Sequence, residues 1–258
     1  MELKGKVVVI TGAASGIGAA MARRFARESP AGLMLVDYNG EAAAAVATSI
    51  GAEHFQMDVS DVEANRQLVE TTEDRFGPID LFCANAGFAV AGTEQSDPDA
   101  WARMWEVNVM AHIHAAKQLI PGWLAQGRGY FLSTASAAGL LTNLGAAEYS
   151  VTKHAAVAFA EWLAVTYGDK GINVSCLCPQ FVNTPLVNAM SELESLIATA
   201  AVLEPSAVAD LVVDGLAAER FLILPHPEVE QYFQNKAGDY DRWITGMQKL
   251  QRTVFPER

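Results

Sequence analysis

Seven short apolar segments, rich in Val, Ile and Leu, recur along the chain. Because their apolar residues run continuously, as in Val7–Ile10, each segment fits a strand that is buried on both faces of a sheet. The sequence therefore predicts seven strands. They cover residues 6–10, 33–37, 79–83, 130–134, 172–177 and 221–224, with a weaker one at 53–57.

Helical patterns fill the intervals between these strands. Their length suits crossover helices between parallel strands. The predicted helices cover residues 17–29, 40–49, 61–76, 98–125, 148–168 and 206–219. This alternation predicts an α/β fold: a doubly wound, seven-stranded parallel sheet flanked by helices, in a single domain over residues 1–258.

The C-terminal extension, residues 225–258, has a different pattern. It begins with Pro225-His226-Pro227 and continues with apolar residues at mostly helical spacing, among them Tyr240, Trp243 and Met247. We expect one amphipathic helix that packs on its own domain or on a second subunit, because so much aromatic surface is costly to leave in water.

Composition narrows the possible partners and the location. The formal net charge of -12, without a stripe of Lys or Arg, disfavours nucleic acid. The first residues lack the zones of a secretory signal, and no apolar run reaches the roughly 18 residues of a membrane span. We therefore expect a soluble, cytoplasmic protein. Cys83, Cys176 and Cys178 lie in apolar segments and are expected to be reduced core residues.

A glycine-rich loop, Thr11-Gly12-Ala13-Ala14-Ser15-Gly16-Ile17-Gly18, joins the first strand to the first helix. Glycines let the backbone approach a pyrophosphate, and the N-terminus of a helix attracts an anion. The spacing Gly-x-x-x-Gly-x-Gly is not the commonest dinucleotide fingerprint. Strand, glycine turn and helix together still predict a Rossmann-type nucleotide site. Its residues are Gly12, Ser15, Gly16, Ile17 and Gly18.

Asp37 ends the second strand and lies beyond this loop. A carboxylate at that place accepts hydrogen bonds from the adenosine ribose hydroxyls and repels a 2′-phosphate, which favours NAD over NADP. Neither Tyr38 nor Asn39 supplies a cation for such a phosphate. The alternative is that Asp37 only caps the helix that begins near Gly40.

A second group of polar residues comprises Ser136, Tyr149 and Lys153. Tyr149 and Lys153 are four residues apart at the start of a predicted helix, so they share one face. A phenol has a pKa of about 10, but a nearby ammonium and a positively charged nicotinamide would stabilise the phenolate. Tyr149 could then take an alcohol proton while Ser136 hydrogen-bonds the substrate oxygen and hydride passes to the cofactor. Alone, such a Tyr-Lys pair is also typical of a solvated helix face.

Taken in order, these motifs resemble the short-chain dehydrogenase/reductase family across essentially the whole chain. The resemblance implies that Asp58 and Val59 contact the adenine and that Asn85-Ala86-Gly87 closes the fourth strand beside the cofactor. It also implies that Asn108 positions a water that links Lys153 to solvent.

The same resemblance implies a catalytic tetrad and a nicotinamide site. Lys153 would also bind the nicotinamide ribose. The tetrad consists of Asn108, Ser136, Tyr149 and Lys153; the segment Pro179, Val182 and Thr184 would lie at the carboxamide end of the cofactor. The implied activity is hydride transfer between NAD(H) and an alcohol or carbonyl carbon.

Two features depart from the family pattern. Gln180 follows Pro179 where the family usually has glycine; it can contact substrate or shape the pocket, or it can point to solvent in a turn that needs no positive φ. The tail lacks the Gly-rich terminus of many tetrameric relatives. The resemblance implies a homodimer through the helices that hold Trp101–Gln118 and Tyr149–Tyr167, and a tetramer stays open.

The substrate pocket is expected at the carboxyl ends of the strands: after Gly87, at Leu140–Leu144, and from Phe181 to about Val202. These segments are largely apolar, and no Arg or Lys occurs from Asn183 to Ala209. This favours a neutral, hydrophobic secondary alcohol or ketone over an anion.

Two other functions are compatible with the same fold. An NADP-linked carbonyl or ketoacyl reductase would require a phosphate-binding cation, and none is evident. A nucleotide-sensing relative without catalysis is disfavoured by the complete tetrad. No metal is expected, because His112 and His114 point to different sides of a helix and lack acidic or cysteine companions at ligand spacing. His154 and His226 are assigned no role.

Overall fold

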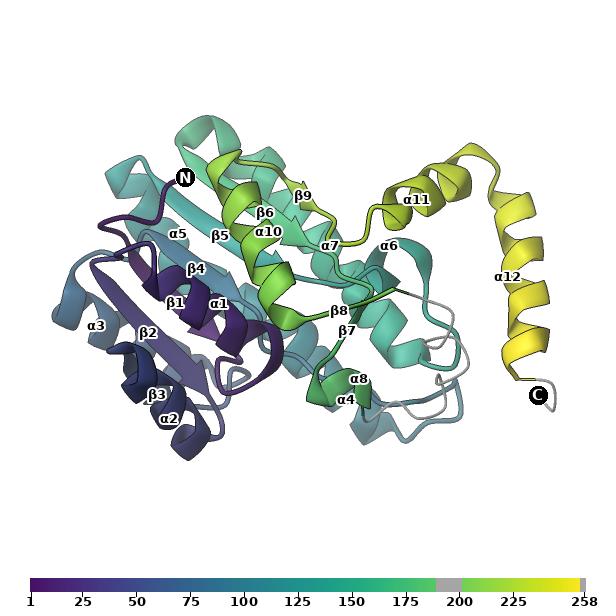
Figure 1. Ribbon diagram of the computed structural model, residues 1–258, viewed down its shortest axis with the longest axis horizontal. Coiled ribbons are helices and arrows are strands. Elements are labelled where there is room, and N and C mark those ends of the chain that lie inside the picture. The colour runs from purple at the N-terminus through teal and green to yellow at the C-terminus, as the bar shows by residue number, and fades with distance from the viewer. Residues whose placement is uncertain (189–200, 256–258) are drawn as a thin grey trace.

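The computed structural model describes residues 1–188 and 201–255. Its central sheet has seven parallel strands in the order β3-β2-β1-β4-β5-β6-β9 (Figure 1). Each strand matches a predicted segment to within about two residues at either end, so the predicted α/β fold is confirmed. The strands are β1 (Val7–Thr11), β2 (Gly32–Asp37), β3 (Glu53–Gln56), β4 (Leu81–Ala84), β5 (Gly129–Thr134), β6 (Ile172–Leu177) and β9 (Leu222–Ile223).

Helices cover both faces of this sheet (Figure 1). One apolar cluster joins the sheet to α1 (Gly16–Ala26), α2 (Gly40–Ile50) and α10 (Pro205–Ala217). A second cluster joins the other face to α3 (Val62–Phe76), α5 (Ala111–Gln126) and α7 (Ala147–Tyr167). The strand order reverses direction between β1 and β4, and ligands of such sheets bind at this reversal, outside the carboxyl ends of the strands.

The helix predicted at 98–125 is interrupted. It consists of α4 (Pro98–Trp105), a π-helical turn over Glu106–Met110, and α5. Such turns often lie at functional sites, and this one carries Asn108. Short elements not predicted from the sequence are α6 (Ala138–Leu141), α8 (Pro185–Asn188), and a parallel pair formed by β7 (Phe181–Val182) and β8 (Val202–Leu203).

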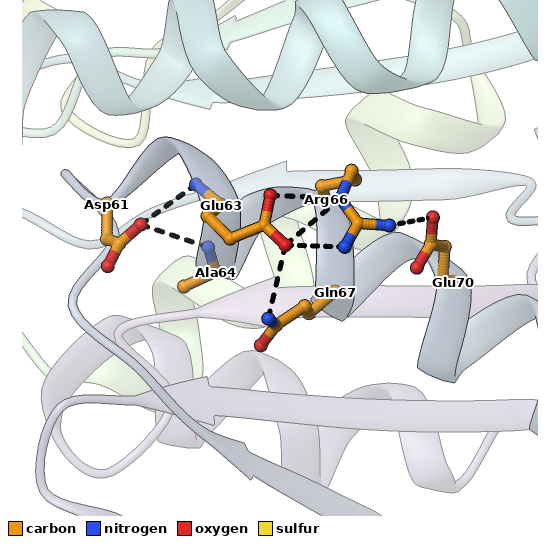
Figure 2. Close-up of polar contacts among 6 residues, drawn as sticks. All are labelled: Asp61, Glu63, Ala64, Arg66, Gln67 and Glu70. Atoms are coloured by element: carbon orange, nitrogen blue, oxygen red, sulfur yellow. Dashed lines mark hydrogen bonds and ion pairs between the residues drawn. The ribbon is translucent and has the colours of Figure 1, made fainter.

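The first turn of α3 begins where the sequence predicts it, at Asp61. The Asp61 carboxylate accepts hydrogen bonds from the backbone N–H groups of Glu63 (2.8 Å) and Ala64 (3.0 Å), as Figure 2 shows. This N-cap satisfies donors that have no partner within the helix. Arg66 forms ion pairs with Glu63 and Glu70 on the same exposed face. Exposed pairs of this kind contribute little to stability, so the cap is what defines the start of α3.

The C-terminal extension differs from the predicted single helix. It forms two helices, α11 (Glu228–Gly238) and α12 (Tyr240–Val254). The break lies at Asp239, which has extended backbone and accepts a hydrogen bond from the N–H of Arg242, so a local cap replaces helix continuity. In Figure 1, α12 stands apart from the sheet, beyond α11. No residue of α12 is fully buried, although Trp243 packs against the edge of the core.

No described helix is both long and apolar enough to cross a bilayer.

Candidate active site

The glycine-rich loop folds tightly against the end of β4. Gly12 has a φ of 67°, and a Cβ atom there would lie 2.8 Å from the Cα of Ala86. A Cβ on Gly18 would lie 2.2 Å from the carbonyl oxygen of Gly12. Ser15 stands at the N-cap of α1 without using its side chain as a cap. The hydroxyl of Ser15 and the first N–H groups of α1 are therefore left to bind an anion.

Asp37 lies at the far end of the same cavity. Its carboxylate accepts hydrogen bonds from the N–H groups of Ala14 (3.1 Å) and Asn39 (3.0 Å), and the residue is 8% exposed. The cap of α2 is Asn39, whose side chain accepts from Ala42. The alternative that Asp37 merely caps α2 is therefore wrong. Asp37 braces the glycine-rich loop and lines the cavity.

Asp58 and Val59 also line the cavity, as does a cation that the sequence analysis missed. Arg103, on α4, donates to the carboxylate of Asp58 (2.6 Å) and to the hydroxyl of Ser60 (2.8 Å). Burial acts to raise the pKa of Asp58, but the hydrogen bonds from Ser60 and Arg103 outweigh it and lower that pKa. In the sequence, Arg103 is one cation within the helix predicted at 98–125, and no motif connects it with Asp58.

The end of β4 is tied to the end of β1. The hydroxyl of Thr11 accepts from the N–H groups of Asn85 and Ala86, both at 3.0 Å, and the side chain of Asn85 donates to the carbonyl of Thr11. A Cβ on Gly87 would lie 3.0 Å from Asn108 Oδ1 and 3.3 Å from Lys153 Nζ. The segment Asn85-Ala86-Gly87 therefore joins the glycine-rich loop to the polar residues of α7.

Ser136, Tyr149 and Lys153 converge on this cavity, as the sequence predicts. Ser136 follows β5, and the other two side chains come from one face of α7. Lys153 Nζ lies 5.7 Å from the centre of the Tyr149 ring and donates to the carbonyl of Thr134 at 3.0 Å. All three residues are buried.

Burial shifts the pKa values of Tyr149 and Lys153 in opposite directions. Burial raises the pKa of Tyr149, and a hydrogen bond with Ser136 only partly opposes this. Burial also lowers the pKa of Lys153 from 10.5 to about 8. Both groups are removed from water, and the ammonium donates to the carbonyl of Thr134. The expectation that Lys153 and a positively charged nicotinamide together stabilise the phenolate concerns the protein with its cofactor bound, and it stays a prediction.

Asn108 does not line the cavity, and neither does Gly18. The Asn108 amide accepts from the N–H of Phe88 (3.1 Å) and donates to its carbonyl (3.0 Å) and to Thr152 (3.2 Å). It therefore holds the segment after β4 against α7, beside Lys153.

Pro179, Val182 and Thr184 form the opposite wall. The methyl group of Thr184 faces Gly16, since a Cβ there would lie 3.2 Å from it. Gln180 lines the cavity, yet its Oε1 atom is buried, so the alternative that this side chain points to solvent is wrong for its amide oxygen. Its backbone does avoid a positive φ. The N–H of Gln180 also donates to His226 Nδ1, a contact that no sequence motif indicates.

The cavity measures about 660 Å³, within the usual range for small-molecule sites. Its lining beside Tyr149 is apolar, because Phe88, Ala89 and Leu186 belong to one apolar cluster with that residue. Leu140–Leu144 does not line it: Leu140 and Leu141 are core residues, and that part of the prediction is wrong. Residues 189–200 of the predicted pocket lie outside the described residues. Within the described ranges, no three acidic, His or Cys side chains cluster as a metal site would require.

Comparison with known proteins identifies the family. The family model described as short chain dehydrogenase matches residues 6–195. The chain belongs to this family. It is 33% identical to 1-deoxy-11-beta-hydroxypentalenate dehydrogenase of Streptomyces exfoliatus, over 95% of this chain and 92% of that protein. It is 35% identical to meso-2,3-butanediol dehydrogenase of Serratia marcescens, over 73% and 76% of the two chains.

A solved structure agrees with this assignment. A short chain dehydrogenase/reductase from Burkholderia phymatum, in complex with NAD, superposes with a TM-score of 0.86 at 30% identity, covering 93% of this chain and 96% of that one. As a member of this family, the protein is an oxidoreductase with a Rossmann-type, nucleotide-binding fold.

Proposed function

We propose that the protein is an NAD-dependent dehydrogenase that interconverts a neutral, hydrophobic secondary alcohol and its ketone. The observation that carries this proposal is the convergence of Ser136, Tyr149 and Lys153 at one end of a cavity whose other end holds the glycine-rich loop and Asp37. The relatives named for dehydrogenation of hydroxylated compounds support the reaction class.

The residues present fit a dinucleotide. Gly12 and Gly16 of the glycine-rich loop line the cavity without side chains, and Ser15 and the start of α1 offer donors for the pyrophosphate. Asp58 and Val59 would contact the adenine, and Asn85-Ala86-Gly87 would lie along the cofactor. Lys153, Tyr149, Pro179, Val182 and Thr184 would surround the nicotinamide riboside.

Asp37 supports NAD over NADP. A 2′-phosphate at this end would lie against a carboxylate whose two oxygens are already fixed by backbone N–H groups. Arg103 is the cation in this region of the lining, and it is paired with Asp58 rather than free for a phosphate. Repulsion by Asp37 therefore outweighs any attraction.

Tyr149 acts as the acid and base in this proposal. When bound, NAD supplies the hydride acceptor, and its positive nicotinamide adds to the charge of Lys153 and stabilises a phenolate. Tyr149 then takes the hydroxyl proton of the alcohol, Ser136 hydrogen-bonds the same oxygen, and the carbinol C–H bond gives up its hydride. In reduction, Tyr149 returns the proton to the ketone oxygen. Asn108 supports Lys153 by positioning its neighbours and a water.

We further propose that the whole chain, residues 1–258, acts as one catalytic unit that associates as a homo-oligomer in the cytoplasm, with no membrane or nucleic acid partner. The long helices α5 and α7 offer a surface for a dimer, since Leu124, Val151, Trp162 and Val165 are exposed on them.

Ligand-induced thermal stabilisation tests the cofactor assignment. NADH at a hundred times its Kd should raise the unfolding free energy by about 2.7 kcal/mol. NADPH at the same concentration should raise it less. Asp37→Asn should reduce the difference between the stabilisation by NADH and that by NADPH. Asp61→Asn, at the exposed N-cap of α3 outside the cavity, should leave this difference unchanged. Greater stabilisation of the unaltered protein by NADPH would overturn the assignment to NAD. A screen of secondary alcohols with NAD tests the reaction.

A further inference from the structure

The backbone after β6 is held by His226, a buried residue from the Pro-His-Pro turn that precedes α11. Its Nδ1 accepts a hydrogen bond from the N–H of Gln180 at 3.1 Å, and its Nε2 lies 3.0 Å from the carbonyl of Phe181. Because the carbonyl can only accept, Nε2 carries the proton and the imidazole is neutral. One ring thus fixes the peptide groups that flank the Gln180–Phe181 pair, which sets where the side chain of Gln180 begins.

The amide of Gln180 is incompletely satisfied. The residue lines the cavity, and its Oε1 atom is buried without a hydrogen-bond partner in the part of the chain that the structure describes. Most buried polar atoms are paired, so an unpaired one at a ligand cavity indicates a partner that the ligand brings. The terminal torsion of Gln is broad and roughly two-fold, so a flip of the amide can present either its oxygen or its nitrogen to that partner.

The position of Gln180 points to the substrate rather than to the cofactor. Its neighbour Pro179 has a carbonyl that accepts from the N–H of Ala137 (2.8 Å) and from the hydroxyl of Ser136 (3.4 Å). Further along the same segment, Thr184 faces Gly16 of the glycine-rich loop. The segment therefore runs from the reacting end of the cavity to the phosphate end, and Gln180 lies at the reacting end.

The surroundings define what Gln180 can recognise. Beside Tyr149 the cavity lining is apolar, because Phe88, Ala89 and Leu186 belong to one apolar cluster with it. A neutral amide that donates and accepts matches a hydroxyl or carbonyl group. The cation at this end, Lys153, already donates to the carbonyl of Thr134. We propose that Gln180 is a specificity-determining residue that hydrogen-bonds a second oxygen of the substrate, on a carbon near the reacting one. The preferred substrates are then diols and hydroxyketones; this rests on the proposed dehydrogenase function.

Matched ketones test the proposal. NADH-dependent reduction of α- and β-hydroxycyclohexanone is compared with that of cyclohexanone, for the unaltered protein and for Gln180→Leu, which keeps the bulk but removes the amide. The unaltered protein should prefer at least one hydroxyketone by about 10- to 100-fold in kcat/KM, the effect of leaving one polar group unpaired. Gln180→Leu should reduce that preference to about threefold or less without slowing cyclohexanone reduction. Gln231→Leu, the same change on an exposed helix face, should change nothing.

Three outcomes would overturn the role of Gln180. The first is a preference of Gln180→Leu for hydroxyketones over cyclohexanone equal to that of the unaltered protein. The second is no such preference in the unaltered protein while it reduces the ketones. The third is a loss of NADH affinity in Gln180→Leu that accounts for the whole change in kcat/KM. Circular dichroism verifies that the variant is folded, and Gln180→Gly, the usual family residue, provides a second test if it is not. No reduction of any ketone or oxidation of any alcohol by the unaltered protein would instead contradict the dehydrogenase function, and the role of Gln180 with it.

Discussion

Lys153 carries a charge that opposes folding. The residue is 3% exposed, and its ammonium makes one hydrogen bond, to the carbonyl of Thr134. Burial lowers its pKa from 10.5 to about 8. At about 1.4 kcal/mol per pH unit, this difference lowers the unfolding free energy by about 3 kcal/mol at neutral pH. Below pH 8 the lysine is charged in both the folded and the unfolded protein, so the unfolding free energy is lowered by the full amount. Between pH 8 and 10.5 only the unfolded chain stays charged, so the cost declines as the pH rises.

Replacing Lys153 with Met should therefore stabilise the protein while abolishing activity. The charge penalty of about 3 kcal/mol disappears, and the lost hydrogen bond to Thr134 costs about 1 kcal/mol. The net gain of about 2 kcal/mol at pH 7 should raise the Tm of a chain this long by about 4 °C. At pH 10 the native lysine is largely neutral already, so the two proteins should have nearly equal Tm values.

Thermal unfolding of the cofactor-free proteins, followed by circular dichroism at pH 7 and pH 10, measures this difference. Lys249→Met, on an exposed face of α12, is the control and should show no comparable pH-dependent gain. A Lys153→Met protein less stable than the unaltered one at pH 7, or stabilised equally at both pH values, would refute the reasoning.

Two further substitutions test the scaffold of the site. Gly18→Ala places a Cβ 2.2 Å from the carbonyl oxygen of Gly12. The loop must shift, so the NADH affinity measured by fluorescence titration should fall at least about tenfold. Gly122→Ala, where a Cβ has no neighbour within 4 Å, should bind NADH with normal affinity. Equal affinity in both would contradict the role of the loop. Asn108→Ala leaves both backbone groups of Phe88 unpaired and should lower the unfolding free energy in urea by about 1–3 kcal/mol. An unchanged urea midpoint would show that Asn108 does not hold this segment.

The fold was predictable because its strands are short, apolar and separated by helical segments. The run Val7 to Ile10 is apolar at every position and is buried on both faces of the sheet, as expected for a central parallel strand. The spacing of apolar residues could not predict that the C-terminal extension divides into two helices. These residues mostly keep the spacing of one continuous helix across the boundary between α11 and α12. The break depends on whether Asp239 bonds locally or continues the helix.

The site was predictable where each motif stands at the end of a strand. The glycine-rich loop, Asp37 and Ser136 follow β1, β2 and β5, and parallel strands bring such ends to one edge. Contacts between distant segments were not predictable. His226 reaches Gln180 from 46 positions away, and no spacing rule connects them. Burial likewise set the pKa of Tyr149, and the sequence shows burial only indirectly.

Tyr149→Phe gives the most direct test of the central claim, that Tyr149 transfers the proton during hydride transfer in this cavity. Once a substrate is found, turnover and NADH affinity are measured side by side for the unaltered protein, Tyr149→Phe and Tyr38→Phe, an exposed residue at the other end of the cavity. Tyr149→Phe should lose roughly 100- to 10,000-fold in kcat while binding NADH normally, and Tyr38→Phe should retain turnover. Full turnover by Tyr149→Phe would contradict the account.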